Sequence, residues 1–217
     1  MQNISDYKTL VFDCDGVILN SNKIKTQAFF DTVKHYGQKE AQDLVDYHVE
    51  NGGVSRYKKF AYFFTEILKI DIEETIFNKL LNSFSVNVKQ GLMRCDVAEG
   101  LSELRVRTKH ARWLIVSGGD QIELNEVFTA RGLDKYFDGG VFGSPDTKEE
   151  ILEREKYCHN ITQPSLFLGD SKYDYKVAKE FGLDFLFISQ WTEIFEWNEW
   201  CQINNLEQVR SIRIILN

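Results

Sequence analysis

Short runs of apolar residues alternate along the chain with longer stretches in which apolar side chains recur at helical spacing. The short runs contain many aromatic and β-branched residues, and each run stops at glycine, serine or aspartate. Continuous apolar runs of this kind are typical of strands that are buried on both faces, as in parallel sheets. We therefore predict strands at Thr9–Phe12, Trp113–Val116, Gly140–Phe142, Ser165–Leu168 and Asp184–Ile188.

Helical patterns occupy the intervals between the later strands. Asp120–Arg131 carries apolar residues on one face, and Ser171–Phe181 stops before Gly182, a residue type that commonly ends a helix. Lys148–Cys158 follows Thr147, and a glutamate three residues after this threonine completes the pattern of a capping box. Alternating strands and helices predict an α/β fold with a doubly wound, mainly parallel, Rossmann-like sheet.

The stretch between the first two predicted strands is different, because it is helical almost throughout. Its clearest breaks are Gly52-Gly53 and Lys69-Ile70-Asp71. About seventy helical residues at this point indicate an α-helical domain inserted into the sheet domain. We expect the helical domain at 20–88 and the sheet domain at 1–19 and 89–217. The candidate helices are Thr26–Tyr36, Gln38–Glu50, Ser55–Leu68 and Ile72–Ser85.

The composition is that of a globular protein, and its charge excludes some partners. The chain has 217 residues, with 33 acidic and 26 basic side chains and a net charge of -7. A protein without a basic surplus is a poor nucleic-acid binder, because it cannot neutralise phosphates. The sequence contains no apolar run of transmembrane length, and its four cysteines form no CxxC pair. We expect a cytoplasmic monomer or homodimer with reduced thiols and without nucleic-acid or membrane partners.

Chemically useful side chains follow the predicted strands. Ligands of open α/β sheets bind outside the carboxyl ends of the strands, so we expect these side chains to converge on one crevice. Carboxylates, a serine with neighbouring glycine amides and a lysine can hold a divalent cation and a phosphoryl group together. The residues are Asp13 and Asp15 after the first strand, Ser117 and Gly118 after the second, Lys148, and Asp170 and Asp174 after the fourth.

Each of these groups suits phosphoryl transfer. A carboxylate can attack phosphorus and form an aspartyl-phosphate, and a second acid two residues later can give and take protons. Hard oxygen ligands suit Mg²⁺, which prefers carboxylates together with substrate phosphate oxygens. Because the aspartates alone would repel a phosphate dianion, the acidic cluster itself predicts a divalent cation.

The ordered set of motifs resembles the haloacid dehalogenase (HAD) superfamily. It begins with Asp13-x-Asp15-Gly16-Val17, continues with Ser117 and Lys148, and ends with Gly169-Asp170-Ser171-x-x-Asp174. The helical insert resembles the cap of the phosphoglycolate phosphatase and β-phosphoglucomutase branch. The resemblance covers essentially the whole chain.

The resemblance implies a Mg²⁺-dependent phosphatase of a small phosphorylated metabolite, such as a sugar phosphate or a phosphoglycolate-like acid. Asp13 would be the nucleophile that forms the aspartyl-phosphate, and Asp15 would be the general acid and base. Phosphate would be bound by Ser117, Gly118 and Lys148, and the metal by Asp13, Asp15 through its carbonyl, Asp170 and Asp174.

Other functions on the same scaffold stay open at this point. The nearest is a phosphotransferase of the β-phosphoglucomutase type, which uses the same residues but keeps the aspartyl-phosphate from water. A dehalogenase has no leaving-group oxygen for Asp15 to protonate, and a non-catalytic binding protein has no need of this acid. A phosphonate hydrolase needs a cap lysine for a Schiff base, and the sequence singles out none.

Three further segments need interpretation. The loop Gly52-Gly53-Val54-Ser55-Arg56 resembles a cap loop that reaches the substrate, where Ser55 and Arg56 would contact it and arginine would bind an anion or hydroxyl groups. An equal alternative makes Ser55 a helix N-cap and leaves Arg56 solvated. We interpret Asp120 as a helix cap. The segment Trp191–Trp200, with three tryptophans, is expected to pack against the core.

Overall fold

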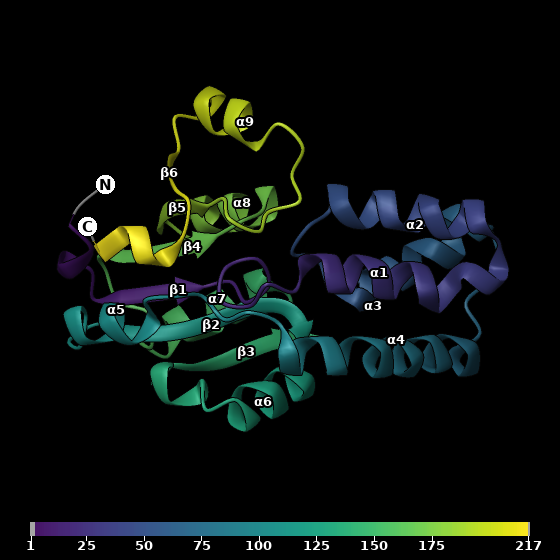
Figure 1. The fold of residues 1–217 in the computed structure, drawn as a ribbon, viewed down its shortest axis with the longest axis horizontal. Coiled ribbons are helices and arrows are strands. Elements are labelled where there is room, and N and C mark those ends of the chain that lie inside the picture. Colours follow the sequence, from purple (N-terminus) through teal and green to yellow (C-terminus); the bar gives the residue numbers. More distant parts are fainter. Residues whose placement is uncertain (1–2, 217) are drawn as a thin grey trace.

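Parallel β-strands form the centre of the computed structural model, which describes residues 3–216 (Figure 1). Within the described residues the sheet has six strands in the order β3-β2-β1-β4-β5-β6, and each neighbouring pair is parallel. The predicted doubly wound, parallel sheet is therefore confirmed. The strands are β1 (Thr9–Phe12), β2 (Arg112–Asp120), β3 (Gly140–Ser144), β4 (Ser165–Gly169), β5 (Asp184–Ile188) and β6 (Glu207–Val209).

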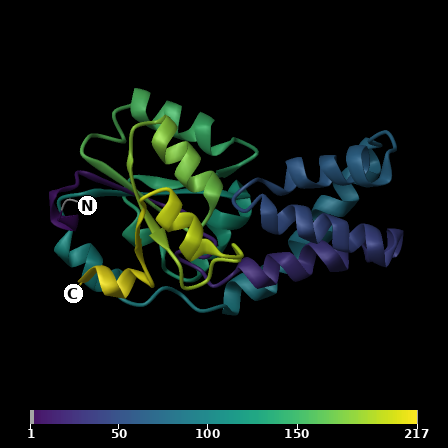
Figure 2. The ribbon, with the colours of Figure 1, turned by 90° about the horizontal axis from the view of Figure 1, so that it is seen from above.

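Side chains of the central strands alternate between two hydrophobic clusters, one on each face of the sheet. Val11 of β1 and Phe167 of β4 belong to one cluster. Leu10 and Phe12, their neighbours on β1, belong to the other. Helices cover both faces, as Figure 2 shows, which is why the strands read as continuous apolar runs. These helices are α5 (Leu101–Arg107) and α6 (Gln121–Ala130) on one face and α7 (Lys148–Tyr157) and α8 (Lys172–Glu180) on the other.

The strand order reverses beside β1. The chain runs from β1 to β2 and β3 on one side, and then crosses to β4, β5 and β6 on the other side. Connections that diverge in this way leave a crevice at the carboxyl ends of the central strands. Asp13 directly follows β1 and Asp170 directly follows β4, so the topology brings together acids that are far apart in sequence.

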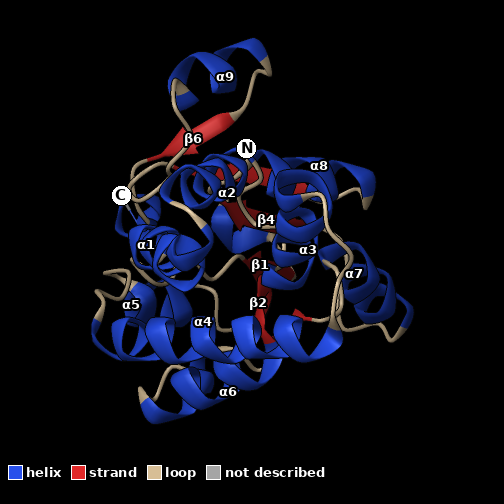
Figure 3. Cartoon of the chain, turned by 90° about the vertical axis from the view of Figure 1, so that its right-hand side faces the viewer, coloured by secondary structure: helices blue, strands red, loops and turns tan. Residues whose placement is uncertain are grey.

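The helices of residues 22–94, between β1 and β2, lie beyond the carboxyl ends of the strands, at the right of Figure 1 and in front of the sheet in Figure 3. The rings of Phe29, Phe60 and Phe84 contact one another between three of these helices. We call this set the helical group. It consists of α1 (Asn22–Val33), α2 (Gln38–Glu50), α3 (Arg56–Tyr62) and α4 (Glu74–Arg94).

Several boundaries differ from the prediction. Strand β2 continues through the glycines to Asp120, and α3 passes into a π-helical turn at Phe63–Leu68. Helix α4 continues past Ser85 to Arg94, so the expected domain boundary at residue 88 falls inside a helix. The short elements α5 and β6 are missing from the prediction. Strand β6 has three residues on the sheet edge, two of them exposed, so it lacks the apolar run that marks a buried strand.

The tryptophan-rich segment packs against the sheet domain, as expected. Trp197 and Trp200 of α9 (Trp197–Ile203) lie on Phe187 of β5, with ring centroids 5.8 and 5.7 Å apart. The four cysteines are free, and Cys14 is buried between the two motif aspartates. In the part of the chain that the structure describes, none of the helices has the length and apolar character that crossing a membrane requires.

Candidate active site

The predicted nucleophile at the end of β1 lies in a buried ion-pair network. Asp13 is 2% exposed, and the Lys148 ammonium lies 2.8 Å from its Oδ1 atom. The same ammonium lies 2.5 Å from Oδ1 of Asp174. Lys148 is the first residue of α7, whose start is held by the predicted capping box of Thr147 and Glu150. One lysine therefore bridges carboxylates that follow two different strands.

Three aspartates form an acidic cluster beside this lysine. Asp13, Asp170 and Asp174 each offer a carboxylate oxygen within 4.8 Å of the others. Asn22, at the start of α1, donates to Asp170 over 2.7 Å. Gly16 has a φ of +77°, and a Cβ atom built on it would lie 2.0 Å from Oδ2 of Asp170. The glycine of the first motif is therefore required both for the turn and for the approach of Asp170.

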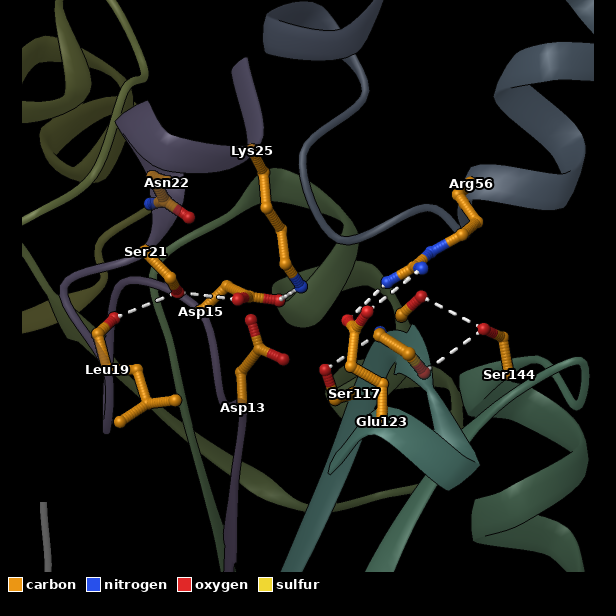
Figure 4. A network of polar contacts seen from close by, with 12 residues as sticks. Asp13, Asp15, Leu19, Ser21, Asn22, Lys25, Arg56, Ser117, Glu123 and Ser144 are labelled. Carbon is orange, nitrogen blue, oxygen red and sulfur yellow. Dashed lines mark hydrogen bonds and ion pairs between the residues drawn. The ribbon is translucent and has the colours of Figure 1, made fainter. Parts of the chain in front are cut away.

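The predicted general acid and base is held by the helical group. Oδ1 of Asp15 accepts a hydrogen bond of 2.6 Å from Ser21, and its Oδ2 accepts one of 2.5 Å from the Lys25 ammonium. Figure 4 shows Asp15 between these two side chains, next to Asp13. Ser21 and Lys25 are four residues apart at the start of α1, so the first turn of the inserted helix orients the acid.

Burial and neighbouring charges shift the acidity of these groups in opposite directions. Burial, with the nearby carboxylates of Asp174 and Asp15, raises the pKa of Asp13 to about 7 against the opposing effect of Lys148. Burial and the same acidic cluster raise the pKa of Asp170 well above its ordinary value. Burial also opposes ionisation of Asp15, but contact with Lys25 and Ser21 holds the pKa of Asp15 below its ordinary value. Asp15 is therefore stabilised as a carboxylate, whereas additional positive charge near Asp13 and Asp170 would be required to stabilise their ionised forms.

The end of β2 meets the loop that begins α3. Ser117 is fully buried, and its hydroxyl accepts a hydrogen bond of 2.9 Å from the Gly119 amide. Ser144 donates to the carbonyls of Gly118 and Gly119 and holds this strand end, as Figure 4 shows. A Cβ atom on Gly118 would lie 2.1 Å from the Gly53 carbonyl. Only glycine permits this approach of the loop to the strand.

Arg56 is buried at the boundary between the helical group and the sheet domain. Its exposure is 4%, so the solvated alternative is wrong. Its Nη2 and Nη1 atoms lie 2.5 and 3.2 Å from the carboxylate of Glu123 on α6, and Nη1 also donates to Ser85. Figure 4 shows the paired side chains pointing toward one another. Ser55 occupies the N-cap position of α3. Contact of Ser55 and Arg56 with substrate stays a prediction.

Asp120 joins the same two parts of the molecule. Its Oδ1 atom accepts hydrogen bonds from the amides of Ile122 and Glu123, which confirms it as the N-cap of α6. Its Oδ2 atom accepts a hydrogen bond of 2.7 Å from the Tyr57 hydroxyl of α3. Arg56 and Tyr57, neighbouring residues at the start of α3, therefore both bind the helical group to the N-terminal end of α6.

A cavity lies between the helical group and the carboxyl ends of the strands. Its wall on the sheet side carries the candidate catalytic acids and the end of β2, and its wall on the helical side carries basic and aromatic side chains. The main lining residues are Asp13, Asp15, Gly118 and Asp170 on the sheet side and Lys25, Phe29, His48, Arg56, Lys59 and Phe84 on the helical side.

The structure thus brings the predicted acids and Lys148 together. Ser117 lies within β2, fully buried, and its hydroxyl accepts from the Gly119 amide. The sequence analysis missed Lys25 and Glu123. A faint signal existed for Lys25, because Ser21 and Lys25 stand on one helix face directly after the motif of Asp13 and Asp15. No local signal marks Glu123, because its partner Arg56 is 67 positions away.

Comparisons with known proteins agree with this geometry. The family model for haloacid dehalogenase-like hydrolases matches residues 7–182. A protein named phosphorylated carbohydrates phosphatase from Thermotoga maritima is 25% identical over 185 residues, which cover 82% of each chain.

Solved structures of similar fold include a predicted phosphatase from Clostridium acetobutylicum, with a TM-score of 0.73 and 16% identity over 97% of this chain and 96% of that one. A β-phosphoglucomutase from Clostridium difficile has a TM-score of 0.69 and 14% identity over 94% and 91%. At such identities the structures show the fold alone, whereas the family model covers most of the sequence. The chain therefore belongs to the family of haloacid dehalogenase-like hydrolases.

Proposed function

We propose that this hydrolase is a phosphatase that removes the phosphoryl group from a small phosphorylated metabolite through an aspartyl-phosphate on Asp13. The observation that carries the proposal is the position of Asp13 at the switch point of the sheet, 2.8 Å from Lys148 and next to Asp15. A carboxylate fixed beside an ammonium and a second acid has the partners that phosphoryl transfer requires. The phosphatase among the relatives of this chain supports the same reaction.

The acidic cluster fits a divalent metal, and we infer that Mg²⁺ binds there. Oxygens of Asp13, Asp170 and Asp174 lie within 4.8 Å of one another, and hard carboxylate donors suit Mg²⁺. The carbonyl of Asp15 completes the proposed ligand set. The bound cation would neutralise the acids and offset the charge of the phosphoryl oxygens.

The proposed reaction has two halves. In the first, a carboxylate oxygen of Asp13 bonds to phosphorus, the ester bond breaks, and Asp15 gives its proton to the leaving oxygen. In the second, Asp15 takes a proton from water as the water oxygen attacks phosphorus, which frees Asp13 and releases phosphate. The contact with Lys25 favours the carboxylate form of Asp15, which is the form needed in the second half, so Asp15 must take up a proton before the first half begins.

The phosphoryl group would be bound by Lys148, by Ser117 and by main-chain amides at Gly118. The helical group, for which the sequence predicted the bounds 20–88, would act as the cap that excludes bulk water and contacts the leaving group, with Ser55 and Arg56 on its loop. The direct approach of the Gly53 carbonyl to Gly118 supports this role, because it closes the loop over the end of β2.

A phosphate-release screen over phosphorylated sugars, phosphorylated hydroxy acids and a generic aryl phosphate tests the proposal, with Mg²⁺ and with chelator. We expect release that needs Mg²⁺ and that Asp13→Asn abolishes. Isomer formation from hexose phosphates without phosphate release would favour the mutase alternative. Absence of both reactions with Mg²⁺ present would refute the proposed function.

A further inference from the structure

One basic side chain of the cavity differs from the others in its surroundings. The basic residues that line the cavity are Lys25, Arg56 and Lys59. Lys25 contacts the carboxylate of Asp15, and Arg56 contacts that of Glu123. Among the described residues, no carboxylate lies in ion-pair contact with Lys59, although this side chain is only 1% exposed.

The partners of Lys59 are neutral groups of the helical group. Its ammonium lies 2.6 Å from Nδ1 of His48 and 3.4 Å from the His48 carbonyl. It also lies 5.6 Å from the centre of the Phe29 ring, which packs on the His48 ring at 4.5 Å. An ammonium can only donate, so Nδ1 of His48 accepts and the ring carries its proton on Nε2. This arrangement uses at most two of the three donors of Lys59.

Burial without a counter-charge is unfavourable for an ammonium. Burial, with the nearby positive charge of Lys25, lowers the pKa of Lys59 to about 7 against the weaker attraction of the Asp15 and Glu193 carboxylates, neither of which is in ion-pair contact with it. Burial and the same lysines keep the pKa of His48 well below its ordinary value, so the imidazole stays neutral and leaves the positive charge to Lys59. An anionic group placed in the cavity would supply the missing partner.

The acids of the cavity do not supply it, because each has another contact. Asp13 contacts Lys148, Asp15 contacts Lys25, and Asp170 accepts a hydrogen bond from Asn22. Glu193, also at the cavity wall, accepts a hydrogen bond of 2.7 Å from Thr26. Lys59 and Asp13 line the same cavity, so the remaining donor of Lys59 is available to the leaving group of a phosphate ester bound at Asp13.

We propose that Lys59, seated on His48, binds an anionic group on the leaving-group part of the substrate, so that the preferred substrates are phosphate esters with a second negative charge. The inference rests on the proposed phosphatase function. The second charge would be a carboxylate or another phosphate, since both accept charge-assisted hydrogen bonds from an ammonium. Lys59 is thereby a specificity-determining residue, distinct from the acids that carry out the reaction.

Matched substrate pairs test this proposal. One pair is 3-phosphoglycerate and glycerol 3-phosphate, which differ by a carboxylate in place of a hydroxymethyl group. The other pair is fructose 1,6-bisphosphate and fructose 6-phosphate, which differ by the second phosphate. We expect the wild-type protein to show the higher kcat/KM on the charged member of at least one pair, and that pair identifies the anion.

The variants are Lys59→Met and Lys59→Gln, with Lys58→Met as the control because Lys58 is the adjacent but exposed lysine of α3. Both Lys59 variants should lower the ratio of kcat/KM between charged and neutral members by about tenfold to 100-fold, the range for a charged hydrogen bond. The control should leave the ratio unchanged. Partial unfolding of a variant lowers its kcat/KM on both members of a pair equally, so it does not change their ratio. Two different replacements are used so that the result does not depend on a folding defect of one of them.

The outcomes separate this inference from the proposed function. Equal losses on both members of each pair, or no preference for the charged member in the wild type, would overturn the assignment of Lys59 while phosphate release continues. If the wild type with Mg²⁺ releases phosphate from none of these esters and from no aryl phosphate, the proposed function fails and this inference fails with it.

Discussion

The buried pair of Arg56 and Glu123 links the helical group to the sheet domain. Its members are 4% and 6% exposed, and two nitrogen–oxygen contacts of 2.5 and 3.2 Å join them. Glu123→Gln removes the carboxylate charge and keeps nearly the same shape. The guanidinium would then remain buried against an amide, a Ser85 hydroxyl and the Phe84 ring.

Removing one member of a buried ion pair costs about 3–5 kcal/mol. The chain can avoid part of this cost, because Arg56 regains water when the helical group moves away from the sheet. Glu123→Gln therefore destabilises the arrangement in which the helical group contacts the sheet domain and the loop of Gly53 lies against Gly118. If turnover needs that arrangement, kcat/KM should fall by about 100-fold, which corresponds to about 2.7 kcal/mol and is a little less than the full cost.

The assay is phosphate release from an aryl phosphate and from the best natural ester, for Glu123→Gln, Arg56→Met and the double variant. We expect large losses on both substrates in the two single variants, with a smaller effect on Tm. The double variant should lose less than either, because it leaves no buried charge without a partner. The matched control is Glu126→Gln, which breaks the exposed contact of Lys89 with Glu126 between α4 and α6. Exposed pairs contribute little, so the control should keep its activity.

Two results would refute this reasoning. Wild-type kcat/KM in Glu123→Gln would show that the pair does not stabilise the productive arrangement. A rise of KM that is confined to the natural ester in Arg56→Met, and absent in Glu123→Gln, would show instead that Arg56 contacts the substrate directly, as the resemblance of its loop to a substrate-binding cap loop implies.

Three other substitutions have defined outcomes. Asp13→Asn should abolish phosphate release while circular dichroism shows the fold intact, and substantial Mg²⁺-dependent activity in this variant would exclude Asp13 as nucleophile. Gly118→Ala should lower kcat/KM, because the added Cβ atom would lie 2.1 Å from the Gly53 carbonyl. The control Gly52→Ala should be tolerated better, because the nearest atom to its Cβ would lie at 3.4 Å. Equal kcat/KM values for the two variants would contradict the close approach of Gly53 to Gly118. Lys59 loses its proton near pH 7 in the folded chain and near the ordinary 10.5 in the unfolded chain. Between these pH values the unfolded state binds more protons, so the free energy of unfolding rises with pH. Urea unfolding should show this rise to be smaller in Lys59→Met, and an unchanged pH dependence would contradict the lowered pKa of Lys59 in the folded protein.

Much of the sheet and of the acidic site could be predicted from sequence, because both depend on local patterns. Strands buried on two faces are continuous apolar runs, and β1 and β5 have the predicted bounds. Acids that directly follow such strands must lie at the same sheet edge, so Asp13 and Asp170 could be placed together without coordinates. The sequence analysis failed at β6, whose residues carry no apolar pattern on the sheet edge.

The pairing of distant charges was decided by the tertiary structure alone. In sequence Arg56 stands at the start of a helix like any solvated arginine, and only the packing of α3 near α6 places it against Glu123. Lys59 differs from Lys58 by one position, yet helix geometry buries the first against His48 and exposes the second. The sequence by itself determined the fold class and the place of the candidate catalytic acids, because strand patterns and turns are local. The residues that close and line the cavity depend on which helix faces meet, and no local pattern encodes that choice.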